Sequence, residues 1–198
     1  LDYFEDMKVS NPIKYNHVVL GSWLSKAEGV VYTNWRFGEF NPDGLQVIYG
    51  QDYGHTDPTT LVKIAIDKKK KIIYAKEELY KSKLTISEIY AINRQRAGRN
   101  LIIGDSASAG TIAELQKLGL NIRGAKKGAG SIATGIALIQ DYELVVDPDS
   151  KNMAKELNNY IYTDKGAQLA CDMYNHSLDA LRYGVSHLLA NRGKIEIR

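Results

Sequence analysis

The sequence predicts an α/β fold in which one mixed β-sheet carries helices on both faces. Two observations support this prediction: three closely spaced apolar runs fall within residues 45–80, and helical and strand-like segments alternate from there to the C-terminus. Strands joined by tight turns pair antiparallel, whereas strands joined through helices pair parallel. A single sheet with both kinds of pairing therefore follows, and 198 residues are enough to bury one sizeable core.

The three runs at the start of this pattern are short and rich in β-branched and aromatic residues. They are LQVIYGQD at 45–52, TTLVKIAID at 59–67 and KIIYAKEELY at 71–80, and this composition is typical of strands. The turn-forming sequence YGHTDP separates the first two runs, and the Lys68–Lys71 tract lies between the second and the third. The three strands are therefore expected to form an antiparallel meander.

The rest of the pattern begins at a capping box. Glu88 follows Thr85 by three residues, a spacing at which each side chain satisfies a backbone N–H group of the other residue at a helix start. The helix is expected to run to about Arg96, and Gly98 stops it. Further strands are expected over 100–105, 120–124 and 143–147, and further helices over about 109–118, 132–140, 150–162 and 175–192. This order of elements is that of the RNase H-like fold.

Residues 1–44 differ from the rest of the chain. They contain both tryptophans, Trp23 and Trp35, together with turn pairs such as Asn11-Pro12, which predicts irregular structure with short strands. We expect two parts: residues 1–44 as a lead-in from an upstream domain, and residues 45–198 as the folded domain.

The composition excludes several classes of protein. No apolar run approaches the ~18–20 residues of a membrane helix, and the single Cys171 excludes an intrachain disulfide or a cysteine-based zinc site. The formal net charge of +3 conceals a basic segment, since residues 61–127 hold 15 Lys and Arg against 6 Asp and Glu. That segment is either an electrostatic footprint for a polyanion or a lysine-rich solvated surface.

Three aspartates lie at the ends of predicted elements that can meet at one edge of the sheet. Asp52 ends the first strand of the meander, Asp105 ends the strand before a helix, and Asp179 lies in the first turns of the last helix. Converging carboxylates repel one another, and a divalent cation removes this repulsion; their oxygens suit Mg²⁺ or Mn²⁺. The alternative for each aspartate is structural, in a turn, at a helix cap or beside a helix dipole.

His176 lies three residues before Asp179 and is expected to share its helix face. There it would orient a water, bind a metal or donate to a leaving group; the alternative is a structural hydrogen bond. The glycine-rich segment 124–131 contains Lys126 and Lys127. These lysines are expected to contact DNA phosphates, unless the segment is only a flexible connection.

Four segments of the chain carry recognisable motifs in one consistent order. They are DYGHTDPTT at 52–60, GDSA at 104–107, KKGAGSIATG at 126–135 and NHSLDALRY at 175–183. Together they resemble the nuclease domain of tailed-phage terminase large subunits. Upstream, GSW at 21–23, with EG at 28–29 and VY at 31–32, is similar to that family's lead-in to the nuclease.

The resemblance implies an RNase H-like endonuclease that cuts double-stranded concatemeric viral DNA during genome packaging, largely independently of sequence. It implies two divalent cations, Mg²⁺ or Mn²⁺, in a two-metal-ion mechanism. The residues carried over are Asp52, Asp105 and Asp179 as metal ligands, His176 as their catalytic companion, and Asp57 as a further metal-site residue that positions a bound water. The DNA-binding residues would be Lys68, Lys69, Lys70, Lys71, Lys126 and Lys127.

The resemblance also implies partners and a location. The chain would follow a packaging ATPase domain and would work with a portal protein and a terminase small subunit. It would act in the cytoplasm of the infected bacterial host, without a membrane.

Two alternatives stay open on the sequence. Another RNase H-like nuclease, such as a Holliday-junction resolvase, would prefer branched DNA over linear duplex. A non-catalytic DNA- or portal-docking module would show no metal binding by calorimetry. For the nuclease, Asp52→Asn or Asp179→Asn is expected to abolish divalent-dependent plasmid nicking, while thermal stability without metal holds or rises.

Overall fold

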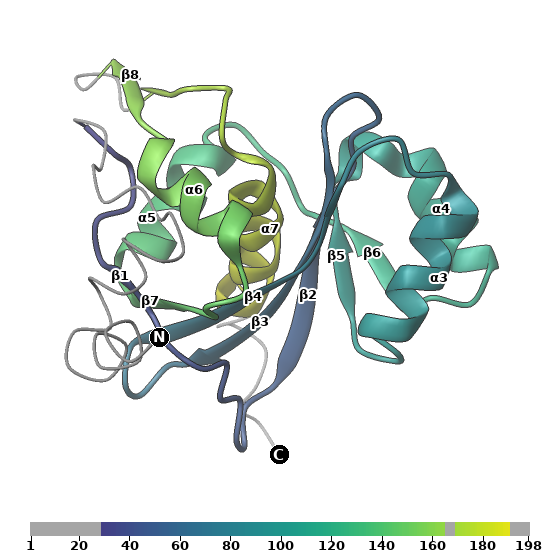
Figure 1. Cartoon of the computed structure of the whole chain (residues 1–198), viewed down its shortest axis with the longest axis horizontal. Helices are drawn as coiled ribbons and strands as arrows, with labels where there is room; N and C mark the ends of the chain where they lie inside the picture. Colours follow the sequence, from purple (N-terminus) through teal and green to yellow (C-terminus); the bar gives the residue numbers. More distant parts are fainter. Residues whose placement is uncertain (1–28, 165–168, 191–198) are drawn as a thin grey trace, which may run out of the picture.

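The computed structural model describes residues 29–164 and 169–190, which form a seven-stranded mixed sheet with helices on both faces (Figure 1). The strand order is β1-β7-β4-β3-β2-β5-β6, and a small second sheet pairs β8 with β9. Within these ranges, no helix is long and apolar enough to cross a membrane. The strands are β1 (Trp35–Phe37), β2 (Val47–Asp52), β3 (Thr59–Asp67), β4 (Ile72–Lys81), β5 (Ile102–Gly104), β6 (Ile122–Gly124), β7 (Glu143–Val146), β8 (Tyr162–Asp164) and β9 (Leu169–Ala170). The helices are α3 (Ile86–Arg96), the short 3-10 helix η1 (Ser106–Ser108), α4 (Ala109–Lys117), α5 (Ser131–Gln140), α6 (Lys151–Asn159) and α7 (His176–Ala190).

The centre of the sheet is the antiparallel meander β2-β3-β4. In its register Asp52 lies opposite Thr60, and Asp67 lies opposite Ile72. Strand β5 pairs parallel with β2, and β7 pairs parallel with β4. The predicted mixed sheet is therefore confirmed, and the carboxyl ends of β2 and β5 lie at the same edge.

Alternation along the strands divides the apolar side chains between two cores. In β2, Ile48 packs with residues of α5, α6 and α7 on one face, whereas Tyr49 packs with residues of α3 and α4 on the other. Figure 1 shows the two groups of helices on opposite sides of the sheet. Because successive side chains of a strand point to opposite faces, Asp52 lies on the same face of β2 as Ile48, toward α7.

Helix α3 begins where the capping box predicts. The side chain of Thr85 accepts from the N–H of Glu88 over 3.3 Å, and Glu88 accepts from the N–H of Thr85 over 2.8 Å. Each bond satisfies a backbone donor that the helix itself cannot pair. Helix α3 ends at Arg96, as expected from Gly98, whose φ of +60° suits glycine.

The chain after α6 departs from the sequence prediction, which extended this helix three residues further. Helix α6 ends at Asn159, and buried Tyr160 adopts an extended backbone. The N–H of Val31 donates to the carbonyl of Tyr160 over 2.8 Å, and the N–H of Tyr162 donates to the carbonyl of Gly29 over 3.1 Å. Pairing with this distant segment replaces the last helical turn, because tertiary contacts override weak local propensity.

The described part of the lead-in contributes to the sheet and its core. Strand β1 pairs parallel with β7, with Trp35 opposite Leu144. Val31 and Tyr32 are buried in the core on the α7 side of the sheet. The division of the chain at residue 45 stays a prediction, and the part of it that concerns residues 1–28 lies outside the described residues.

Candidate active site

Asp52 and Asp105 lie side by side at the carboxyl ends of two parallel strands. The register pairs Gln51 of β2 with Gly104 of β5, and the N–H of Asp105 donates to the carbonyl of Gln51 over 3.0 Å. Ile103 packs in the core on the α7 side, and Asp105 follows it by two residues. Alternation therefore directs both carboxylates to the α7 face of the sheet.

Helix α7 completes the site, and Gly50 allows its close approach. A Cβ built on Gly50 would lie 1.8 Å from the carbonyl oxygen of Ala180, so only glycine fits between β2 and α7. The helix brings His176 and Asp179 to the end of β2. Nδ1 of His176 lies 3.5 Å from Oδ2 of Asp52, and this contact raises the pKa of His176, against the opposing effect of burial.

The start of α7 is held by a buried carboxylate on α6. Glu156 is 1% exposed and accepts from the N–H groups of Ser177 (2.8 Å) and Leu178 (3.2 Å) and from the hydroxyl of Tyr80 (3.1 Å). It satisfies two donors that a helix start leaves free, and its charge suits the positive end of the helix dipole. Burial raises the pKa of Glu156 to about 7, although these hydrogen bonds and nearby His176 oppose the shift.

Like Asp52, which contacts His176, Asp105 and Asp179 each contact a basic side chain. Nη2 of Arg182 lies 2.7 Å from Oδ1 of Asp179, one turn earlier on the same helix. The ammonium group of Lys127 pairs with Oδ1 of Asp105. In the described structure, therefore, each of the three predicted aspartates contacts one basic side chain.

These surroundings shift the two carboxyl groups in opposite directions. Burial raises the pKa of Asp105, but Lys127 and the N–H of Ala107 outweigh it, so the pKa lies below its usual value. Burial raises the pKa of Asp179 above its usual value, because Arg182 offsets only part of that effect. Neighbouring carboxyl groups with opposed shifts are typical of functional sites.

The donor chemistry fits a divalent cation, although the side chains are not arranged around one. Among the described residues, no three acidic, histidine or cysteine side chains are close enough to hold one ion. Asp105 is instead engaged with Lys127, and Asp179 with Arg182. Carboxylate oxygens are nevertheless the hard ligands that Mg²⁺ and Mn²⁺ take, and the ammonium on Asp105 shows that this carboxylate accepts a cation.

Comparison of the chain with known protein families shows which family it belongs to. Residues 52–187, more than half of the chain, match the family model described as terminase RNase H-like domain. The chain belongs to this family. The match includes all three aspartates, His176 and Lys127.

The large terminase of bacteriophage SPP1 is similar to this terminase domain over most of its length, both in sequence and in structure. The terminase large subunit of Bacillus phage SPP1 is 32% identical over an alignment 201 residues long, which covers 90% of this chain and 46% of that protein. The chain thus spans about half the length of that relative. The crystal structure of the large terminase nuclease domain of bacteriophage SPP1 with bound Mn has a TM-score of 0.69 and 30% identity, covering 81% of this chain and 99% of that one.

A more distant relative shares the fold. The large terminase of the thermophilic bacteriophage D6E has a TM-score of 0.68 and 22% identity, covering 81% of this chain and 46% of that chain. The RNase H-like fold predicted from the order of elements is therefore confirmed.

The remaining predicted residues on this side of the terminase domain differ in their contacts. Asp57 is exposed in the turn between β2 and β3, at the same edge of the sheet as Asp52. Lys126 is exposed in the segment between β6 and α5. Its neighbour Lys127 instead reaches into the site. The roles of Asp57 and Lys126 stay predictions.

The Lys68–Lys71 tract lies at the opposite end of the sheet from the aspartates. Thr60 is paired with Asp52, and Asp67 follows it by seven residues along β3, which corresponds to roughly 23 Å at ~3.3 Å per residue. Nζ of Lys68 donates to the carbonyl of Leu188 near the end of α7 over 3.2 Å. DNA contact by this tract stays a prediction, and such DNA would have to extend well beyond the aspartates.

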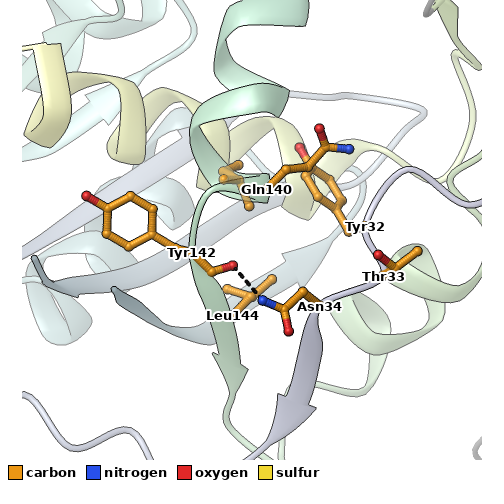
Figure 2. Close-up of a pocket in the computed structure, with 7 residues that line it drawn as sticks. Tyr32, Thr33, Asn34, Gln140, Tyr142 and Leu144 are labelled. Atoms are coloured by element: carbon orange, nitrogen blue, oxygen red, sulfur yellow. Dashed lines mark hydrogen bonds between the residues drawn. The ribbon is translucent and has the colours of Figure 1, made fainter. Parts of the chain in front are cut away.

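A small cavity of about 110 Å³ also lies away from the aspartates (Figure 2). It is near the start of β7, where Glu143 pairs with Ile72 at the end of β4 farthest from Lys81. Nδ2 of Asn34 donates across it to the carbonyl of Tyr142 over 3.3 Å. The candidate active site therefore lies at the sheet edge and not in this cavity. The cavity is lined by Tyr32, Thr33, Asn34, Ile139, Gln140, Tyr142 and Leu144.

Sequence reasoning missed two residues that organise the site. Arg182 falls within a quoted motif, and its spacing of three residues from Asp179 is the helical spacing at which charged side chains meet. Glu156 lies among Met153, Ala154 and Leu157 on the buried face of α6. A glutamate on an apolar helix face was the available signal, since buried carboxylates require partners.

Proposed function

We propose that this terminase domain is a metal-dependent endonuclease that cuts double-stranded concatemeric DNA during viral genome packaging. One observation carries the proposal: Asp52 and Asp105 lie together on neighbouring strand ends, and α7 brings Asp179 and His176 to the same edge. The SPP1 nuclease domain, which matches over 99% of its length, was crystallised with Mn. Membership of the terminase family favours this function over a junction resolvase.

The cofactors are two divalent cations, Mg²⁺ or Mn²⁺. When bound, they supply Lewis acidity that activates the attacking water and stabilises the leaving 3′ oxygen. Asp52, Asp105 and Asp179 would hold the ions through their carboxylate oxygens. Lys127 and Arg182, which pair with Asp105 and Asp179, would compete with the ions for these oxygens.

The other polar residues prepare the site. Arg182 holds Asp179 on one side, and Glu156 fixes the helix start from which His176 projects. His176, with Nδ1 at Asp52, would use Nε2 to orient the water or to protonate the leaving oxygen. Asp57, in the exposed turn at the same edge, would help position the water.

DNA would be held through its phosphates and not through base edges, so cleavage would be largely independent of sequence. Lys126 is exposed beside the site and Lys127 is at its edge. In the whole protein the domain would follow a packaging ATPase domain and meet a portal protein and a small subunit in the host cytoplasm. The SPP1 relative, about twice as long as this chain, is itself named a terminase large subunit.

Nicking of supercoiled plasmid by the purified chain tests the proposal. Activity is expected with Mn²⁺ or Mg²⁺, none with EDTA, and Asp52→Asn should reduce the rate by more than ~100-fold because a central ligand is lost. Asp141→Asn is the matched control, since it makes the same chemical change at an exposed position just after the C-terminal end of α5, away from the β6–α5 segment that carries Lys127. Activity that survives Asp52→Asn, or that persists in EDTA, would overturn the assignment.

A further inference from the structure

Lys127 differs from the other basic partners of the aspartates because it can move without disturbing the core. Arg182 is 5% exposed and packs against α5, where a Cβ on Gly135 would lie 2.5 Å from its Cγ. His176 is held at the start of α7. The side chain of Lys127 is 37% exposed on the segment between β6 and α5, and Gly128 follows it with open space around its Cα.

The ammonium group of Lys127 lies beside the carboxylates of the site. It pairs with Oδ1 of Asp105 and lies 4.9 Å from the ring centroid of Tyr183, which is 5% exposed on α7. Burial raises the pKa of Asp105, but Lys127 helps to bring it below its usual value. Burial also raises the pKa of Asp179, and there Lys127 offsets only part of the rise. A single mobile side chain therefore neutralises part of a carboxylate cluster that would otherwise repel itself.

We propose that Lys127 is a displaceable resident cation, which neutralises Asp105 in the metal-free site and leaves it for a DNA phosphate when a divalent ion binds. The inference rests on the proposed function. A divalent ion that takes Oδ1 of Asp105 competes with the ammonium for this oxygen and repels its charge, so metal binding should weaken the Lys127 ion pair. The freed ammonium, on a flexible four-carbon stem at the edge of the site, then suits a phosphate oxygen. Metal loading and DNA binding are thereby coupled through one side chain.

Calorimetric titration of the 198-residue chain with Mn²⁺ alone, without DNA, tests the first half of the proposal. Lys127→Met should bind Mn²⁺ about tenfold more tightly than the wild type, because a neighbouring positive charge changes the cation affinity of a carboxylate by at least about that factor. Lys126→Met removes the same charge from the preceding residue, which is exposed, and should leave the Mn²⁺ affinity within about twofold of the wild type. Thermal melting without metal confirms that both variants are folded.

Chemical labelling of the wild-type chain tests the displacement itself. Acylation of lysine amines, quantified by mass spectrometry, should increase at Lys127 several-fold when Mn²⁺ is added, because the ammonium is released from Asp105. Labelling of Lys126 provides an internal control and should not change. This readout needs no catalysis and no DNA.

The outcomes separate this inference from the proposed function. If Asp52→Asn weakens Mn²⁺ binding but Lys127→Met binds Mn²⁺ no more tightly than wild type, the metal site stands and the role of Lys127 is wrong. Equal gains in Mn²⁺ affinity from Lys127→Met and Lys126→Met would also overturn the role of Lys127, since equal gains would reflect only the lower net positive charge of the protein. A wild-type chain that does not bind Mn²⁺ would overturn both.

Discussion

Gly50→Ala is the most direct test of how the site is assembled. The added Cβ would lie 1.8 Å from the carbonyl oxygen of Ala180, whereas non-bonded heavy atoms are comfortable at about 3.5 Å. Helix α7 must therefore retreat from β2 by roughly 1.7 Å, and neither partner is a flexible side chain that can turn away. Overpacking of this kind costs about 3 kcal/mol of unfolding free energy.

The same displacement separates Asp52 from the two site residues on α7. Misplacement by ~1 Å can reduce catalysis about 100-fold, so Gly50→Ala should lose nicking activity by about that factor at a temperature where it is still folded. Urea unfolding measures the stability, Mn²⁺ titration the metal affinity, and plasmid nicking the rate. All three should change together.

Gly110→Ala is the matched control for this substitution. Gly110 lies in the first turn of α4, where an added Cβ would meet nothing within 4 Å. The variant should gain up to about 1 kcal/mol of stability and keep wild-type nicking. If Gly50→Ala behaves like Gly110→Ala in both assays, then α7 does not pack on β2 as described and the reasoning is refuted.

Two further predictions concern buried carboxylates. Asp179→Asn should lower the stability of the metal-free domain by about 2 kcal/mol, because it leaves buried Arg182 without a charged partner. This revises the expectation from sequence, which was an unchanged or higher stability. Urea unfolding in EDTA measures the change, and a stability equal to or above that of the wild type would contradict the prediction. For Glu156, burial sets a folded-state pKa of about 7 against the usual 4.5, so the folded protein binds more protons between these values and stability should fall by about 3 kcal/mol as pH rises through them. Glu156→Gln should flatten this dependence in urea unfolding between pH 5 and pH 8, and an unchanged slope would assign it to another group.

The elements that could be predicted from sequence are those specified by neighbours in the chain. Short apolar runs rich in β-branched residues predicted the meander, and the capping box of Thr85 and Glu88 predicted the start of α3. Asp52 and Asp105 could be nominated because Asp52 ends one strand and Asp105 directly follows another, and the ends of parallel strands share an edge. The predicted end of α6 was wrong because Tyr160 and Tyr162 pair with a segment about 130 residues earlier in the chain. A pattern of neighbouring residues cannot reveal such a distant pairing.

By itself, then, the sequence determined the order of strands and helices, the mixed character of the sheet and the four acidic and histidine candidates at one edge. Each of these depends on residues within a few positions of one another. Tertiary structure alone decided the charge partners: Lys127 reaches Asp105 across 22 positions, and Glu156 caps α7 across 21. Such contacts depend on how the β6–α5 segment and α6 pack against α7, so whether the carboxylates face a metal or a lysine is a property of the folded chain.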